Sequence, residues 1–304
     1  NFGWVYDMSN QAQTDLIRAG QGFIAALDQS GGSTPKALAA YGIGPDGFAS
    51  NADMYDLIHE MRARIVKSPD FNGKKVVGAI LFEDTMGREF AGKPAPSYLW
   101  QDRGVVPFLK VDKGLLDTAE DVQLLKPIPD LAPLLERATG LGVFGTKMRS
   151  VIHAANRKGI DQVVDQQFAI GAQITAHGLM PILEPEVTIS IADKAEAETL
   201  LRASILEHLD NLPSDQFVML KLTLPEFTNQ YLDLCQHPRV LSVVALSGGY
   251  SRAEANGRLA QNKSMIASFS RALTEGLSAQ QSDVKFDELL SQTIDGIYQA
   301  SISG

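Results

Sequence analysis

The sequence predicts a single (β/α)8 barrel, also called a TIM barrel, that spans residues 1–304 as one catalytic domain. Eight short apolar stretches recur along the chain, and longer amphipathic segments separate most of them. No linker rich in Pro, Gly or Ser interrupts this alternation. Repeated strand–helix units build a parallel sheet with right-handed crossovers, and eight of them favour a closed barrel over an open sheet.

The expected strands are four to eight residues long, as buried parallel strands usually are, and are rich in Val, Ile, Leu or Phe. They cover residues 22–27, 75–82, 105–111, 142–147, 180–183, 217–222, 240–246 and 265–269.

Apolar residues spaced three and four positions apart predict the helices between these strands. The clearest cover residues 53–61, 154–176, 192–209, 226–235 and 286–301. Residues 88–104 form the longest stretch without periodicity, so we expect a loop at one end of the barrel.

The charge balance excludes some partners. The formal net charge is -9, so the chain lacks the general basic surface that binds nucleic acid or an anionic membrane. No apolar run approaches the roughly 18 to 20 residues of a membrane span. The first residues, Asn1-Phe2-Gly3-Trp4, do not resemble a signal peptide.

Cysteine and histidine usage argues against disulfide and metal chemistry. The only cysteine, Cys235, cannot form an internal disulfide, which favours a reducing cytoplasm. The five histidines lack metal-binding spacing, so no metal site is expected.

Polar residues stand at the predicted carboxyl ends of the strands, which is where barrel enzymes have their active sites. In order they are Asp28, Glu83, Lys110, Lys147, Glu184, Lys221, Ser247 and Arg271. Three strands also have charges two positions apart, in the pairs Lys110 and Asp112, Lys147 and Arg149, and Glu184 and Glu186. A period of two puts both members on one face, which in a barrel can be the interior. The alternative is that each charge marks only a solvated strand end.

Lys221 is exceptional because apolar residues precede and follow it on its strand. Lysine is seldom buried for structural reasons alone. Burial and a nearby cation such as Lys147 would disfavour the ammonium form, and a neutral amine can attack a ketone to form an imine. The alternative is a core lysine paired with a glutamate.

Two segments have the features of phosphate sites. Ser247-Gly248-Gly249 lies between a strand and a helix that starts near Ser251, and Arg271 can add a charge-assisted contact. The second segment is Ser30-Gly31-Gly32-Ser33-Thr34-Pro35-Lys36, in which Ser33 or Thr34 would cap a helix. Helix capping alone could also explain this second segment.

Taken in order, these motifs resemble those of the class I fructose-1,6-bisphosphate aldolases, and the resemblance runs over nearly the whole chain. The matching segments are Ala26-Leu27-Asp28-Gln29-Ser30, Leu109-Lys110-Val111-Asp112-Lys113-Gly114, Thr146-Lys147-Met148-Arg149, Pro181-Ile182-Leu183-Glu184-Pro185-Glu186, Leu220-Lys221, Leu246-Ser247-Gly248-Gly249 and Phe269-Ser270-Arg271-Ala272-Leu273.

The resemblance implies a metal-independent lyase of glycolysis and gluconeogenesis that needs no cofactor. Lys221 would form a Schiff base with fructose 1,6-bisphosphate or dihydroxyacetone phosphate, and Glu184 would be the principal acid and base, supported by Glu186. Asp28 and Lys147 would orient and polarise the intermediates.

The resemblance also implies how substrate is held. Arg149 would contact substrate, one phosphate would bind Ser247, Gly248, Gly249 and Arg271, and the other would bind Ser33 and Lys110, with Ser30 and Lys36 nearby.

Some residues depart from the animal members of the family and suggest a bacterial-type branch. Gln29 replaces a common acidic residue, Met148 stands where animals have Trp, and Leu222 and Thr223 differ from the usual segment. Tyr298 falls in the predicted last helix and should not take the role of the animal tail tyrosine, so the proton donor to the enamine stays open.

Two other functions fit parts of the pattern. A transaldolase or an aldolase for a single phosphate would also form an imine, although two phosphate segments favour a bisphosphate. A non-catalytic sugar-phosphate binder would not need an imine-forming amine. The sequence leaves the oligomeric state open, including an assembly of identical subunits.

Overall fold

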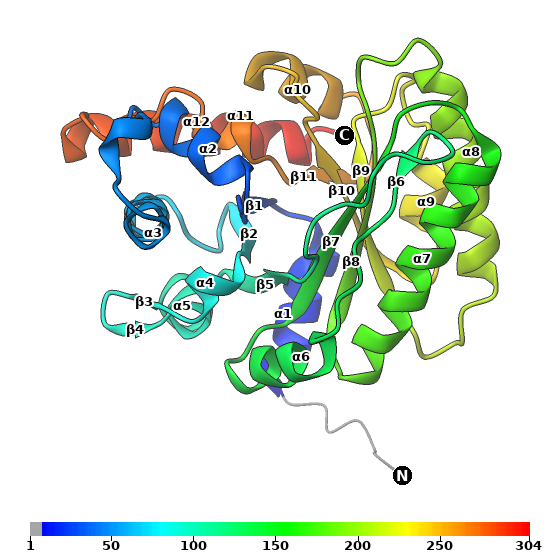
Figure 1. The fold of residues 1–304 in the computed structure, drawn as a ribbon, viewed down its shortest axis with the longest axis horizontal. Coiled ribbons are helices and arrows are strands. Elements are labelled where there is room, and N and C mark those ends of the chain that lie inside the picture. The colour runs from blue at the N-terminus through cyan, green and yellow to red at the C-terminus, as the bar shows by residue number, and fades with distance from the viewer. Residues whose placement is uncertain (1–7) are drawn as a thin grey trace.

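Eight parallel strands form a nearly closed barrel (Figure 1) in the computed structural model, which describes residues 8–304. The strands are β1 (Phe23–Leu27), β2 (Val76–Leu81), β5 (Val106–Lys110), β7 (Gly145–Ile152), β8 (Met180–Val187), β9 (Val218–Thr223), β10 (Val240–Leu246) and β11 (Met265–Ala267). Each pairs in parallel with the next. Beside the last strand, the backbone N–H of Ala26 in β1 donates to the carbonyl of Phe269, two residues after β11, at 3.2 Å. All eight predicted strands and the barrel are therefore confirmed.

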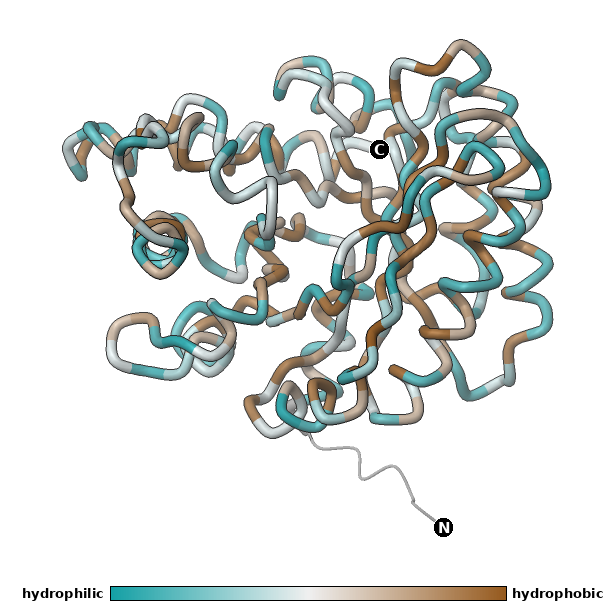
Figure 2. The backbone as a smooth tube through the Cα atoms, in the orientation of Figure 1, coloured by the Kyte–Doolittle hydropathy of each residue, from teal (hydrophilic) through white to brown (hydrophobic). Residues whose placement is uncertain are grey.

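Helices alternate with the strands and cover the outside of the barrel. The longer ones are α2 (Ser33–Ala40), α3 (Asn51–Lys67), α6 (Leu131–Gly140), α7 (Arg157–Ala176), α8 (Lys194–Asp210), α10 (Arg252–Leu259) and α12 (Asp283–Ile302). Hydrophilic and hydrophobic residues alternate along α7 and α8 (Figure 2), as expected for helices with one face on the barrel.

The helix predicted over residues 226–235 is mostly wrong. Only α9 (Leu232–Gln236) forms, because Asn229 adopts a left-handed backbone conformation with φ of 61°. The backbone N–H of Asn229 donates to Asn262 Oδ1 at 2.8 Å, and Asn229 Oδ1 accepts from the backbone of Lys263 at 2.8 Å. These bonds to the chain before β11 replace the bonds of a helix.

The loop predicted over residues 88–104 is instead folded. It contains the hairpin strands β3 (Glu89–Phe90) and β4 (Lys93–Pro94), the short helix α5 (Ala95–Ser97) and a π-helical turn (Tyr98–Asp102). Ala91 and Gly92 both have positive φ, of 51° and 77°, which is what a tight two-residue hairpin turn requires.

The barrel interior is apolar toward the amino ends of the strands and charged toward their carboxyl ends. Apolar side chains, Phe108, Ile182 and Met219 among them, form a buried cluster that is separate from the larger one between strands and helices. Two positions further along the same strands stand Lys110, Glu184 and Lys221, on the same face because side chains alternate along a strand. The charges therefore lie toward the carboxyl ends of the strands.

An additional helix closes the other end. α1 (Met8–Ala19) packs against β10 and β2, and its fully buried Ile17 belongs to the interior cluster. Among the described residues no helix is both long enough and apolar enough to cross a membrane. The expectation about a signal peptide concerns residues 1–4, which lie outside the described part of the chain.

Candidate active site

Strands β7 and β8 are longer than the sequence predicted and carry the charged residues inside them. They continue to Ile152 and Val187 rather than ending at residues 147 and 183. Arg149 is paired with Glu184 across the two strands. These residues therefore lie within strands, not at strand ends, and regular backbone pairing fixes their positions.

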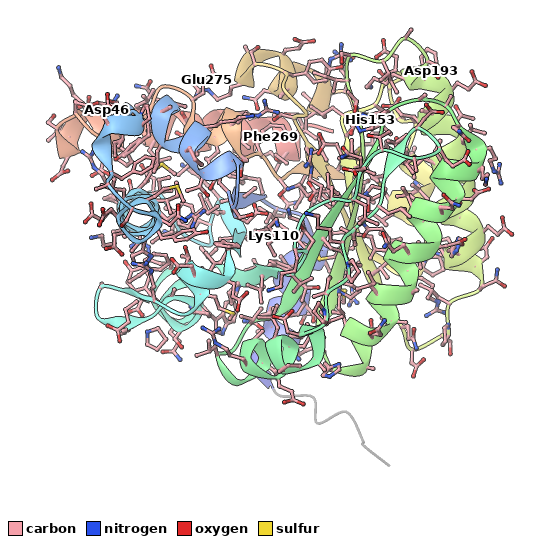
Figure 3. All side chains as sticks on the ribbon, viewed as in Figure 1. Asp46, Lys110, His153, Asp193, Phe269 and Glu275 are labelled. Atoms are coloured by element: carbon pink, nitrogen blue, oxygen red, sulfur yellow. The ribbon has the colours of Figure 1, made fainter. Side chains whose placement is uncertain are left out.

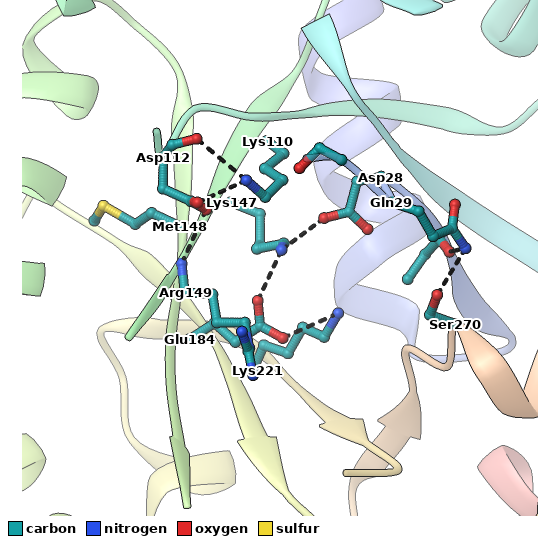
Figure 4. Close-up of polar contacts among 12 residues, drawn as sticks. Asp28, Gln29, Lys110, Asp112, Lys147, Met148, Arg149, Glu184, Lys221 and Ser270 are labelled. Atoms are coloured by element: carbon teal, nitrogen blue, oxygen red, sulfur yellow. Dashed lines mark hydrogen bonds and ion pairs between the residues drawn. The ribbon is translucent and has the colours of Figure 1, made fainter. Parts of the chain in front are cut away.

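Four buried side chains, three on strands β7, β8 and β9 and one directly after β1, form a continuous chain of ion pairs (Figure 4). Lys147 Nζ lies 2.6 Å from Asp28 Oδ2 and 2.9 Å from Glu184 Oε2. Lys221 Nζ lies 3.3 Å from Glu184 Oε1. Each of the four is less than a tenth exposed. The structure thus brings together Asp28, Lys147, Glu184 and Lys221, as expected from the sequence.

The charges of Lys147 and Asp28 stabilise one another. Burial acts to raise the pKa of Asp28, but the cations Lys147, Lys221 and Lys110 outweigh it and lower the value to about 2. Burial likewise acts to lower the pKa of Lys147, but Asp28 and Glu184 raise it above its ordinary value. Lys147 is therefore a fixed cation. Lys221 forms one, longer ion pair with the described residues, and its partner Glu184 is shared with Lys147.

A second charged group adjoins the first. Lys110 Nζ lies 2.6 Å from Asp112 Oδ1, and Asp112 Oδ2 accepts from the backbone N–H of Arg149 at 3.2 Å. Arg149 also forms an ion pair with Glu186. Lys110 lies near the middle of the molecule in Figure 3, whereas Asp46 and Asp193 lie toward its periphery. Lys110 is paired with Lys147 across β5 and β7, so the two groups are adjacent.

Arg271 meets the Ser-Gly-Gly segment, although not from a strand end. β11 ends at Ala267, and Arg271 begins the short helix α11 (Arg271–Thr274). A Cβ on Gly249 would lie 3.6 Å from Arg271 Nη2, so the guanidinium lies beside that backbone. Gly248 and Gly249 have φ of 61° and 121°, and Ser251 caps α10 by accepting from the backbone of Glu254. A compact loop, a helix start and a guanidinium converge here.

The segment after β1 differs from its prediction. α2 begins at Ser33, and Gly32 takes the N-cap position without a side-chain bond, so neither Ser33 nor Thr34 is the cap. The Ser33 hydroxyl instead closes a local turn, donating to the carbonyl of Ser30 and accepting from its N–H. Thr34 is buried, and Lys36 forms no ion pair with the described residues.

Arg62 and Thr85, which the sequence did not single out, form a buried contact next to Gln29, the residue that follows Asp28. Arg62 of α3 is fully buried and donates through Nη2 to the carbonyl of Gln29 at 2.5 Å. Its guanidinium also donates to Thr85 Oγ1 at 2.7 Å. The sequence does indicate that Arg62 is buried, because it falls four residues after Ile58 and four before Val66, on an otherwise apolar face of α3.

The departures from the animal motifs have structural roles. Thr223 accepts from the backbone N–H of Val187 and donates to its carbonyl, at 2.9 and 2.8 Å, and so joins the ends of β9 and β8. Met148 and Leu222 are buried in the core. These residues complete the barrel wall beside the charged group.

Three further observations concern groups that could bind a metal, a thiol and the C-terminal tyrosine. No group of three or more His, Cys, Asp or Glu residues within residues 8–304 is arranged to hold a metal. Burial raises the pKa of the Cys235 thiol to about 12, which disfavours a reactive thiolate. Tyr298 lies on α12, close enough to contribute to raising the pKa of Lys75. Lys75 directly precedes β2, at the amino end of the barrel.

Comparisons with known proteins bear on the family and the fold of the whole chain. The family model described as "Fructose-bisphosphate aldolase class-I" matches residues 8–227. The class 1 fructose-bisphosphate aldolases of Synechocystis sp. and Porphyromonas gingivalis are 57% and 54% identical to the chain, over 97% and 96% of its length and 98% and 99% of theirs. A solved fructose-bisphosphate aldolase from Plasmodium falciparum superposes with a TM-score of 0.78 at 21% identity, covering 97% of this chain and 95% of that one. The last comparison supports the fold.

Proposed function

The chain belongs to the class I fructose-bisphosphate aldolase family, and we propose that Lys221 is the residue with which it forms the Schiff base. As a member of this family it is a glycolytic lyase that reversibly cleaves fructose 1,6-bisphosphate to dihydroxyacetone phosphate and glyceraldehyde 3-phosphate. The family's chemistry is metal-independent and proceeds through a covalent imine.

The observation that carries the proposal is the sharing of Glu184 by two lysines. Lys147 is held by two carboxylates, at 2.6 and 2.9 Å, while Lys221 forms one ion pair within residues 8–304, with Glu184 at 3.3 Å. An amine must be neutral to attack a carbonyl carbon. Of the two amines, Lys221 is therefore the one that can give up its proton, with Glu184 as the acceptor, and Lys147 remains a cation.

Glu184 then serves as acid and base in turn. Neutral Lys221 Nζ adds to the C2 carbonyl, and the proton on Glu184 goes to the carbinolamine hydroxyl, which leaves as water and gives a protonated imine. The Glu184 carboxylate next removes the C4 hydroxyl proton. The electron pair of the C3–C4 bond moves to the imine, and glyceraldehyde 3-phosphate departs.

The remaining steps return the free enzyme. The enamine takes a proton at C3, and water hydrolyses the resulting imine to release dihydroxyacetone phosphate. We assign no donor for that proton, because the end of the chain lies near the amino ends of the strands and not near Lys221. A Cβ on Gly304 would touch Asn262, which precedes β11. Tyr298, on the same helix, is not expected to be the donor.

The neighbouring charges position the intermediates. The Lys147 ammonium, fixed by Asp28, can stabilise negative charge that develops on the C2 or C4 oxygen. Glu186 holds Arg149, whose side chain is 41% exposed and is therefore accessible to substrate. Asp28 contributes mainly by keeping Lys147 charged and oriented.

Two opposed groups are proposed to hold the phosphates. Ser247, Gly248, Gly249 and Arg271 would take one, through backbone N–H groups and the guanidinium beside them. Lys110 would take the other, with Ser33, Ser30 and Lys36 at the start of α2. Because Ser33 already closes a turn with Ser30, its hydroxyl would have to change partner to bind phosphate.

We also infer that residues 1–304 act as a single catalytic domain in the cytoplasm with sugar phosphates as the small-molecule ligands. The barrel has no second sheet large enough to form another core among the described residues. An assembly of identical subunits remains a proposal that sedimentation of the purified protein would test.

Borohydride trapping tests the assignment of Lys221. The protein is incubated with dihydroxyacetone phosphate, reduced with sodium borohydride, digested and analysed by mass spectrometry. We expect the adduct on Lys221, its loss in Lys221→Met, and its retention in the exposed control Lys158→Met. An adduct on another lysine would contradict the assignment.

The same preparation distinguishes the alternatives. Turnover of a monophosphate without turnover of fructose 1,6-bisphosphate would indicate a transaldolase or a single-phosphate aldolase. Absence of any adduct would favour a non-catalytic sugar-phosphate binder, and loss of activity with EDTA would indicate a metal mechanism. We expect activity with the bisphosphate that EDTA does not change.

A further inference from the structure

Regular pairing between β8 and β9 stops one position before Glu184 and Lys221. Among the described residues, the last pair between the two strands is Leu183 with Leu220, and the same register would next place Glu184 beside Lys221. The other edges of these strands stay paired, since β7 pairs with every residue of β8, and β10 pairs along β9 to its last residue. A gap in the pairing therefore lies between β8 and β9 at the level of the two charged side chains.

The Thr223 hydroxyl takes the place of the missing pairing at the end of β8. It accepts from the backbone N–H of Val187 at 2.9 Å and donates to the carbonyl of Val187 at 2.8 Å. A hydroxyl can accept and donate at once, so one side chain satisfies both backbone groups that a paired strand would satisfy. Thr223 is almost fully buried, so water does not compete for these bonds. It joins β8 and β9 again two positions beyond Lys221.

Buried charges hold the chain that directly follows Thr223. Lys194, at the start of α8, donates to the carbonyl of Leu224 at 2.9 Å and forms an ion pair with Glu198 at 2.6 Å. Glu198 also accepts from the backbone N–H of Glu226 at 2.8 Å. Both charged side chains are buried, where a charge is costly unless it is paired and hydrogen-bonded. The backbone on the far side of Thr223 is therefore fixed, and its hydroxyl stays directed at β8.

The gap in the pairing agrees with the longer ion pair of Lys221. Neighbouring strands in a regular sheet lie about 4.8 Å apart, which would bring an ammonium and a carboxylate at paired positions into close contact. Here Lys221 Nζ lies 3.3 Å from Glu184 Oε1, whereas Lys147 Nζ lies 2.9 Å from Glu184 Oε2. A tightly paired ammonium keeps its proton, and a distant one cannot pass its proton to the carboxylate. The spacing between the ends of β8 and β9 thus matters for the chemistry.

We propose that Thr223 is a positioning residue for the proton transfer between Lys221 and Glu184. Its hydroxyl holds β9 to β8 beyond the gap in the pairing and so sets the spacing of the two reacting side chains. The hydroxyl hydrogen is already donated to β8, so Thr223 acts through the strand and not as a ligand of substrate. The inference rests on the proposed function, since it concerns how the imine-forming amine is placed.

Thr223→Val removes the hydroxyl and nearly keeps the shape of the side chain. The N–H and carbonyl of Val187 then lose their partner, and the end of β9 can move relative to β8. We expect kcat for cleavage of fructose 1,6-bisphosphate to fall by about 10- to 100-fold, the effect of misplacing a reacting group by about 1 Å. The rate at which borohydride traps dihydroxyacetone phosphate on Lys221 should fall likewise. KM should change by less than about threefold, because no substrate contact is removed.

Thr223→Ser is the conservative variant, because it keeps the hydroxyl and loses only a methyl group. Its kcat should stay within about threefold of wild type. Thr293→Val is the matched control, since it removes a buried hydroxyl of α12 that has no partner among the described residues. This control should leave kcat and KM unchanged. Thermal unfolding checks that each variant is folded, and Thr223→Ala carries the same expectation if Thr223→Val does not fold.

The outcomes separate this inference from the proposed function. A wild-type protein that gives no adduct on Lys221 would overturn both. An adduct in the wild type, together with unchanged kcat in Thr223→Val, would overturn the role of Thr223 alone. A raised KM at unchanged kcat would mean that Thr223 holds substrate rather than β9. A loss in Thr223→Ser as large as in Thr223→Val would show that the hydroxyl is not the group that positions the strand.

Discussion

Lys147 Nζ and Asp28 Oδ2 lie 2.6 Å apart, and both side chains are almost fully buried. The ammonium also lies 2.9 Å from Glu184 Oε2, so one cation neutralises two carboxylates. Taking such charges out of water is costly, and removing one partner leaves the others without compensation. The ion pair is thus a condition for keeping Glu184 inside the barrel next to Lys221.

Lys147→Met should therefore destabilise the fold. The variant leaves Asp28 and Glu184 buried without their principal cation, and we expect the free energy of unfolding to fall by about 3–5 kcal/mol. Denaturant unfolding at neutral pH measures it. The matched control is Lys158→Met, which removes a largely exposed lysine and should cost no more than about 1 kcal/mol. Equal losses in both variants would show that burial of the cluster has no special cost.

The lowered pKa of Asp28 predicts how acid affects stability. Its folded value is about 2 and its ordinary value is 3.8. A carboxyl whose pKa is lower in the folded state stabilises the fold above its ordinary pKa, and this contribution is lost as the pH falls toward the folded value. The stabilisation from Asp28 should thus be complete above about pH 4 and disappear between about pH 4 and pH 2.

The comparison that isolates this effect is between Asp28→Asn and the exposed control Asp215→Asn. The free energy of unfolding, measured between pH 6 and pH 3, should fall less steeply in Asp28→Asn than in wild type, and Asp215→Asn should follow wild type. Parallel curves for all three proteins would mean that Asp28 has the same pKa in the folded and unfolded chains.

The sequence was sufficient for the strands because each buried parallel strand is a short apolar run. It misplaced the ends of β7 and β8 because Arg149, Glu184 and Glu186 break the apolar pattern while still facing the barrel interior. The spacing of two between charged residues did indicate correctly that they share one face of the strand. The contact between Arg62 and Gln29 could not be predicted in this way, since 33 residues separate them and only the packing of α3 brings them together.

Gly248 should be intolerant of a side chain. Its φ is 61°, and an added Cβ would lie 2.7 Å from Ile189 Cγ2, closer than van der Waals contact allows. We expect Gly248→Ala to displace the loop beside Arg271 and to raise KM for fructose 1,6-bisphosphate by at least about tenfold, because a small misplacement of a binding group is costly. Steady-state kinetics measures the change.

Gly257→Ala is the matched control, because this helical glycine of α10 has open space around its Cα. Alanine there should leave KM unchanged and stabilise the protein by about 0.5–1 kcal/mol, since alanine favours the helix. If Gly248→Ala behaved like Gly257→Ala, the backbone of residues 247–249 would not be part of the substrate site.

Glu184→Gln separates the catalytic role of Glu184 from its packing. Glutamine has nearly the same shape but can neither accept the proton of Lys221 nor return it to the carbinolamine. We expect kcat for cleavage to fall by about 10²–10⁴-fold, the usual contribution of a positioned acid and base. The exposed variant Glu288→Gln on α12 is the control and should keep wild-type kcat. A fall of less than tenfold would mean that another group carries out these proton transfers. Glu186, two residues further along β8, is the nearest candidate on the same strand.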